Sequence, residues 1–128
     1  MKQVTLVPAW LMILTGLGII LFWIAFFTFH LAPPDAPPCY LAFEHSFPLP
    51  DGLLAVGLIT AGVLAMRGRK SARTLSLVCA GALMFLGLLD ISFNLQNGIY
   101  GLGVSELISM AAINIWCVAF GAALAIWP

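Results

Sequence analysis

Four long apolar stretches restrict the chain to folds that can accommodate them. The first, Pro8 to Leu31, contains no formal charge. It is longer than the apolar region of a signal peptide, about 7–15 residues, and reaches the roughly 20 residues of a transmembrane helix. We therefore predict that it is retained as a spanning helix. The four predicted spans cover residues 8–31, 51–66, 74–95 and 104–127.

Composition supports a membrane environment for the whole chain. Hydrophobic residues make up 62% of the 128 residues and charged residues 8%, whereas a soluble domain carries about a quarter charged residues. The length suits one domain. We predict an all-α fold, a single transmembrane domain over residues 1–128 that forms a four-helix bundle in lipid. The formal net charge of zero shows no basic excess, so nucleic acid is not an expected partner.

The connecting segments predict an orientation. Residues 32–50 hold six of the eight prolines, which predicts an ordered but non-helical outer loop. Residues 67–73 form a basic loop between the second and third spans. Four spans place both termini on the side of this loop, which the positive-inside rule makes cytoplasmic. That face is expected to hold every basic residue, namely Lys2, Arg67, Arg69, Lys70 and Arg73.

The acidic residues follow the opposite distribution. All of them are predicted in the outer loop or in the outer part of a span, and both histidines join them there. This asymmetry gathers the groups capable of acid/base chemistry at one end of the bundle. The residues are Asp35, Glu44, Asp51, Asp90, Glu106, His30 and His45.

Asp90 is the strongest single candidate for function. It follows Thr74 by 16 residues, about 24 Å of helix, and so lies within the hydrocarbon core. A carboxylate at that depth costs about 2.5 kcal/mol or more, so it should face the bundle interior. Asn94 and Asn97 share its helical face. The alternative role for this group is a hydrogen-bonded clasp between helices.

Other polar residues each allow two interpretations. Asp51 and Glu106 begin helices, where they either cap free N–H groups or line a ligand site. Asn114, near mid-membrane, contacts another helix or a ligand. Glu44 and His45 belong either to a solvated loop or to a lid with general acid/base capacity over the outer mouth.

Aromatic and small residues suggest how the helices meet. Trp23 and its phenylalanine neighbours form either a packing surface or the apolar wall of a ligand site. Most of the other large polar aromatics are assigned to the belts at the membrane interfaces, namely Trp10, Trp116, Trp127, Tyr40 and Tyr100. Glycines allow close helix approach, although none forms a G-x-x-x-G motif. The glycines expected to do so are Gly16, Gly18, Gly57, Gly62, Gly81 and Gly87.

Metal and cofactor sites have little support in the sequence. No C-x-x-C pair joins the three cysteines, and no helical His-x-x-x-His or Glu-x-x-His spacing occurs. We predict no metal ion and no cofactor. Phosphate-binding loops, nucleophile elbows and dinucleotide fingerprints are also absent from the sequence.

Three short segments resemble small uncharacterised bacterial four-helix membrane proteins of the YvaD-like type. They are His30–Pro34, Ser46–Asp51 and Gly87–Phe93. This chain departs from that pattern at Glu44–His45 and by carrying Asp90. The resemblance implies a fold and no settled activity. At fold level only, inward acids in a four- or five-helix bundle are similar to emopamil-binding and sigma-2 type membrane proteins, which bind or isomerise lipophilic molecules.

Three functions are compatible with the sequence. The first is an outward-facing pocket for a lipophilic or amphipathic small molecule. If the chain is an enzyme, Asp90 would donate a proton and Glu44 or Glu106 would act as its partner in an isomerase, cyclase or epoxide-opening reaction. The second is an accessory subunit of a larger membrane complex, and the third is a small dimeric transporter. The predicted pocket residues are Asp90, Asn94, Asn97, Glu106 and Asn114 with Trp23 nearby, and Glu44, His45 and Asp51 at the mouth.

Overall fold

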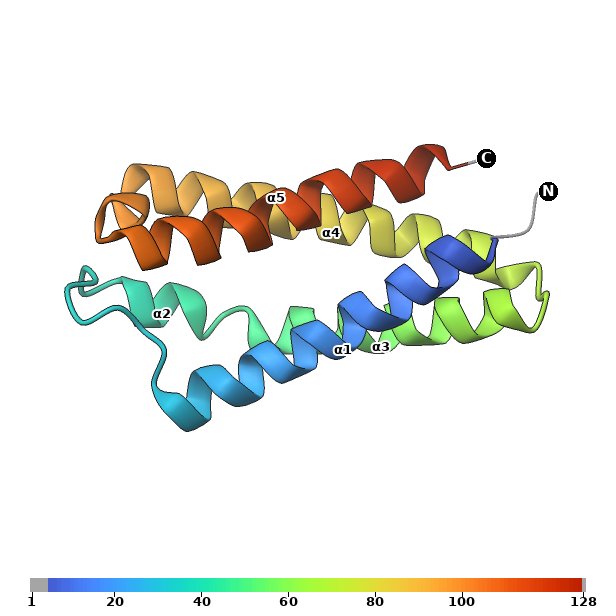
Figure 1. Cartoon of the computed structure of the whole chain (residues 1–128), viewed down its shortest axis with the longest axis horizontal. Helices are drawn as coiled ribbons and strands as arrows, with labels where there is room; N and C mark the ends of the chain where they lie inside the picture. The colour runs from blue at the N-terminus through green and yellow to red at the C-terminus, as the bar shows by residue number, and fades with distance from the viewer. Residues whose placement is uncertain (1–4, 128) are drawn as a thin grey trace.

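The computed structural model describes residues 5–127, which form four long helices in an elongated bundle (Figure 1). Among these residues there is no strand, so the all-α fold class is confirmed. The elements in chain order are α1 (Leu6–Phe29), α2 (Tyr40–Glu44), α3 (Pro48–Met66), α4 (Ser71–Gln96), the 3-10 turn η1 (Ile99–Gly101) and α5 (Val104–Ile126).

All four long segments have the length and apolar character needed to cross a bilayer. The second comprises α2 and α3 together, residues 40–66. Only 22–33% of the most hydrophobic part of each segment is buried inside the molecule, so most apolar side chains face outward. Leu21 and Ile108 are each 65% exposed. Four helices of this length with apolar outer surfaces are compatible with a protein that spans a membrane, because each helix satisfies its own backbone.

The helix boundaries differ slightly from the predicted spans, for local reasons. α3 begins at Pro48 rather than at residue 51, because proline fits the first turn of a helix. α1 ends at Phe29, since His30 adopts a left-handed conformation with φ 52° and prolines follow. The prediction that residues 32–50 are non-helical is wrong for α2. Residues 40–47 contain no proline, so their N–H groups are free to form a helical turn.

Glycines bring α1 and α3 into close contact. A Cβ atom built on Gly16 would lie 2.9 Å from the carbonyl oxygen of Ala55. One built on Gly62 would lie 2.7 Å from the carbonyl oxygen of Ala9. Each helix therefore contributes one glycine against the backbone of the other, as is common where membrane helices pack closely.

A matching pair of contacts joins α4 to α5. A Cβ atom on Gly121 would lie 2.8 Å from the carbonyl oxygen of Ala80, and one on Gly87 would lie 3.0 Å from the Cβ of Cys117. The expectation of close approach at Gly18 and Gly81 is wrong, because no atom lies within 4 Å of a Cβ built at either position. The bundle thus consists of two tight pairs, α1–α3 and α4–α5.

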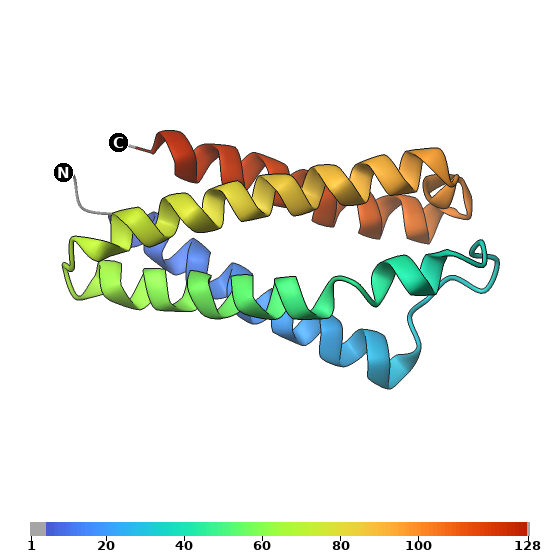
Figure 2. The same ribbon diagram turned by 180° about the vertical axis from the view of Figure 1, so that it is seen from behind.

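The two pairs are joined mainly through α3 and α4, which run side by side in Figure 2. The described basic residues, Arg67, Arg69, Lys70 and Arg73, lie at the end of the bundle where α1 starts and α5 ends. Arg73 Nη1 donates a hydrogen bond of 3.3 Å to the carbonyl oxygen of Leu124 and so satisfies an acceptor near the end of α5. Lys2, predicted on the same face, lies outside the described residues.

Candidate functional site

A cavity of about 490 Å³ lies within the bundle, between α1 and α5, with α2, α3 and α4 completing its walls. Ligand-binding sites commonly measure about 300–1,000 Å³. On α1 the lining extends from Leu11 to Trp23, about 18 Å of helix. Most of the wall is apolar and includes Leu14, Ile19, Phe22, Leu54, Leu83, Leu86, Met110 and Ile113.

The cavity opens sideways. α1 packs along α3, and α5 packs along α4, but α1 and α5 do not pack along one another. Figure 1 shows the C-terminal end of α1 diverging from α5. Leu14, Ile113 and Trp116 line the cavity and are nevertheless 58%, 41% and 43% exposed. The opening therefore faces the zone that bilayer hydrocarbon would occupy around a spanning bundle.

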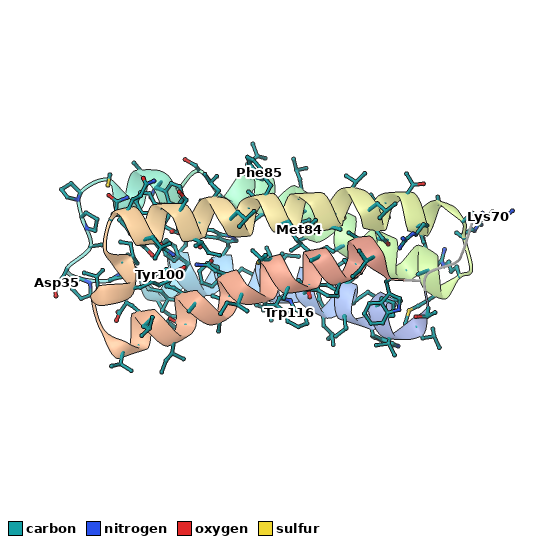
Figure 3. All side chains as sticks on the ribbon, turned by 90° about the horizontal axis from the view of Figure 1, so that it is seen from above. Asp35, Lys70, Met84, Phe85, Tyr100 and Trp116 are labelled. Carbon is teal, nitrogen blue, oxygen red and sulfur yellow. The ribbon has the colours of Figure 1, made fainter. Side chains whose placement is uncertain are left out.

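One hydrogen bond crosses this opening. Trp116 Nε1 donates to Thr15 Oγ1 over 3.1 Å and links α5 to α1. The assignment of Trp116 to an interfacial belt is wrong, because the residue lies in the middle of α5 and projects from the mid-length of the bundle in Figure 3. Its place in the sequence, 12 residues or about 18 Å after the start of α5, is the signal that could have located it.

Glu44 reaches the cavity from α2, which lies at the end of the bundle away from the two termini (Figure 1). The side chain is 5% exposed, lines the cavity and has one carboxyl oxygen, Oε1, without a hydrogen-bond partner. Phe47, which follows α2, also lines the cavity. The segment from α2 to the start of α3 therefore contributes to the cavity wall, and its role as a lid stays a prediction. The solvated-loop interpretation does not hold for Glu44.

Asp51 and Trp23 form a link between α3 and α1. Trp23 Nε1 donates a hydrogen bond of 2.8 Å to Asp51 Oδ2, and both residues line the cavity. Asp51 lies in the first turn of α3, where a negative charge complements the helix dipole, but the N-cap residue is Phe47 and no side-chain cap hydrogen bond forms there. The carboxylate of Asp51 is directed toward α1, where it accepts the hydrogen bond from Trp23.

On α4, Asp90 and Asn94 are both directed into the protein. Asp90 lines the cavity, and its Oδ1 is buried without a partner. Asn94 is fully buried with neither side-chain atom hydrogen-bonded, although it does not line the cavity. A clasp between helices would pair these groups, so the structure gives no support for that alternative. Asn97 lies further out, where its Nδ2 bonds the Phe93 carbonyl oxygen.

The remaining predicted residues divide into two groups. Asn114 is buried, lines the cavity and donates a hydrogen bond to the Tyr100 hydroxyl. Glu106 and His45 do not line the cavity. Glu106 lies in the first turn of α5 beside Gly103, and His45 is exposed with its ring 5.6 Å from that of Phe27.

The structure thus brings Glu44, Asp51, Asp90, Asn114 and Trp23 to one cavity. The sequence reasoning missed Thr15 and Gly18, which carry no charge and lie in an otherwise apolar stretch. A second cavity of about 580 Å³, between α3 and α4, is lined by apolar residues and Ser46 and contains no acid. The two cavities therefore differ chiefly in the presence of carboxyl groups.

Within residues 5–127, no group of three or more His, Cys, Asp or Glu side chains is close enough to hold a metal ion. The carboxyl groups of the cavity come from three different helices, α2, α3 and α4. Comparison of the chain with protein families, with curated proteins and with solved structures finds no match. The site itself is therefore the basis for any functional assignment.

Proposed function

We propose that this protein binds a lipophilic small molecule that enters the α1–α5 cavity from the bilayer. The observation that carries the proposal is the cavity itself, an apolar chamber with a sideways opening and a few polar groups near one end. Such a combination of apolar walls and sparse polar groups is typical of small-molecule sites. Acid/base chemistry at Asp90 and Glu44 stays a prediction, since a site that only binds a ligand could have the same lining residues.

The proposed orientation places the acidic end of the cavity toward the outer leaflet of a bacterial inner membrane. It rests on the basic residues within 67–73, which lie at the opposite end of the bundle from Asp35, as Figure 3 shows for Lys70. The positive-inside rule assigns such a basic turn to the cytoplasm. A ligand would then reach the site from the outer half of the membrane.

Filling the cavity at Gly18 is expected to abolish binding. Gly18 lines the cavity, and a Cβ added to it would meet no atom within 4 Å, so Gly18→Leu places a side chain in the open space. Lipids extracted with the purified protein, measured by mass spectrometry, should contain a bound lipophilic molecule in the wild type that falls at least about tenfold in the variant. The matched control is Gly81→Leu, since Gly81 is equally open and lies outside both cavities.

The control also defines what would refute the proposal. Both substitutions add the same apolar side chain to a helix, so both should leave the elution profile and helical content unchanged. Equal retention of the bound molecule by Gly18→Leu and the wild type would show that the cavity is not its site. A protein that carries another polypeptide and no small molecule would favour the accessory-subunit function instead.

The native cysteines allow the orientation to be measured. Cys39 is exposed in the connection before α2, whereas Cys79 is buried and Cys117 is half-buried. A membrane-impermeant maleimide applied to bacterial spheroplasts should therefore label Cys39. In a Cys39→Ser background, Arg69→Cys should be labelled only after the membrane is permeabilised. The reverse pattern would place the basic turn outside the cell.

A further inference from the structure

We infer that the ligand of this cavity carries a positive charge, and that it is a lipophilic amine held in its protonated form. This inference rests on the proposed function and narrows it to one chemical class. It is carried by the juxtaposition of two carboxyl groups that have unpartnered oxygens, Glu44 and Asp90, with an apolar chamber open to lipid.

The cavity has acids and no basic side chain among its described lining residues. Glu44, Asp51 and Asp90 all line it, and no Lys, Arg or His does. The nearest basic residue on α4 is Arg73, which precedes Asp90 by 17 residues, about 26 Å of helix. His30 and His45 belong to this end of the bundle but are exposed. The lining therefore supplies no counter-charge to these carboxyl groups.

The unpaired carboxyl oxygens indicate a ligand that donates hydrogen bonds. Glu44 is only 5% exposed, yet its Oε1 has no donor, and neither has Asp90 Oδ1. Asp51 has one donor, the indole N–H of Trp23. Buried polar atoms are nearly always hydrogen-bonded, so unpaired carboxyl oxygens on two residues that line the cavity indicate a missing donor beside it. A protonated amine provides both the donor and the charge that these oxygens lack.

The aromatic lining favours an organic cation. Phe22, Trp23 and Trp116 line the same cavity, and the faces of aromatic rings attract ammonium groups. A bare metal ion would need converging ligands, which are not found among the described residues. An alkyl chain attached to the amine would occupy the apolar part of the cavity between α1 and α5. A fatty acid is disfavoured, because its carboxylate would meet the acids.

Matched probes can test the charge separately from the cavity. We would titrate purified protein in maltoside micelles with N,N-dimethyldodecylamine and with the neutral dodecyl methyl ether, following the intrinsic tryptophan fluorescence, to which Trp23 and Trp116 of the cavity contribute. At neutral pH the amine is expected to bind at least about tenfold more tightly than the ether, since hydrogen bonds to charged groups are stronger than neutral ones. This preference should disappear in the Glu44→Gln/Asp90→Asn double variant. Asp35→Asn, the same change at an exposed acid, should retain it.

The outcomes separate the two proposals. Equal affinity of the wild type for amine and ether, with both lost in Gly18→Leu, would overturn the cationic ligand and leave the lipophilic cavity standing. Binding of neither probe would overturn both. The ratio of the two affinities in the wild type decides the question even if the double variant fails to fold.

Discussion

Gly62→Val is expected to separate α1 from α3 and to cost the protein a large part of its stability. A Cβ at this position would lie 2.7 Å from the carbonyl oxygen of Ala9 and 2.5 Å from a side-chain carbon of Ile13. Because the first of these atoms belongs to the backbone, the helix itself has to move. Overpacking commonly costs about 1–3 kcal/mol, and we expect the upper end of that range here.

This effect can be measured by unfolding the protein in mixed micelles of maltoside and dodecyl sulfate and following the circular dichroism signal. Gly81→Val is the matched control, since a Cβ there meets nothing within 4 Å. It introduces the same β-branched residue into a long helix. Similar losses of stability in both variants would mean that helix propensity, and not the contact between α1 and α3, explains the result.

Trp23→Ala is expected to destabilise the end of the bundle that contains α2 by about 3–5 kcal/mol, the usual cost of removing a large buried aromatic side chain. Trp23 is 8% exposed and packs with Phe26, Tyr40, Phe47 and Ile99. The substitution also removes the hydrogen bond that Trp23 Nε1 donates to Asp51. The same unfolding measurement in mixed micelles reports the loss.

Three further substitutions separate the contributions of packing and of hydrogen bonding to this loss of stability. Trp23→Phe keeps an aromatic ring and removes the N–H, so it should cost about 1–3 kcal/mol. Asp51→Asn keeps an oxygen that can accept the bond and should cost less than Asp51→Leu. If Asp51→Leu proved as stable as the wild type, the link between α1 and α3 would contribute nothing to the fold.

The fold class could be predicted from the sequence because lipid allows few alternatives. A spanning segment must satisfy its own backbone, so four long apolar stretches lead to four helices. The helix ends were less predictable. The proline-rich composition of residues 32–50 concealed α2, although the helix occupies a part of this segment that has no proline.

The cavity could be predicted only in part. Charged or amide groups within apolar stretches stand out, which is why Asp90 and Asn114 could be identified. Helical periodicity placed Asn94 and Asn97 on the face of Asp90, yet neither lines the cavity. The reason is that a helix face does not specify depth, and the polar groups of α4 extend past the end of the chamber. Which helix faces which depends on side-chain packing between distant segments, and no local pattern encodes it.

The glycines also show that a local sequence pattern does not reveal which residues pack against a distant helix. Gly16, Gly62, Gly87 and Gly121 all meet a neighbouring helix, whereas Gly18 and Gly81 do not. On α1, Gly16 and Gly18 are only two residues apart and point about 200° apart around the helix. One therefore packs against α3, and the other leaves the space that becomes the cavity. Spacing within one helix could not distinguish them, because the partner surfaces lie elsewhere in the sequence.

The sideways opening between α1 and α5 affects the apparent affinity that would be measured for any ligand. A molecule that arrives through this opening comes from the hydrocarbon phase, so its concentration there, and not in water, sets the occupancy of the site. Lengthening the alkyl chain of a probe will raise its membrane partitioning and lower its aqueous dissociation constant, even if its contacts in the chamber are unchanged. Affinities for this protein are therefore best expressed as mole fractions of probe in the lipid or detergent.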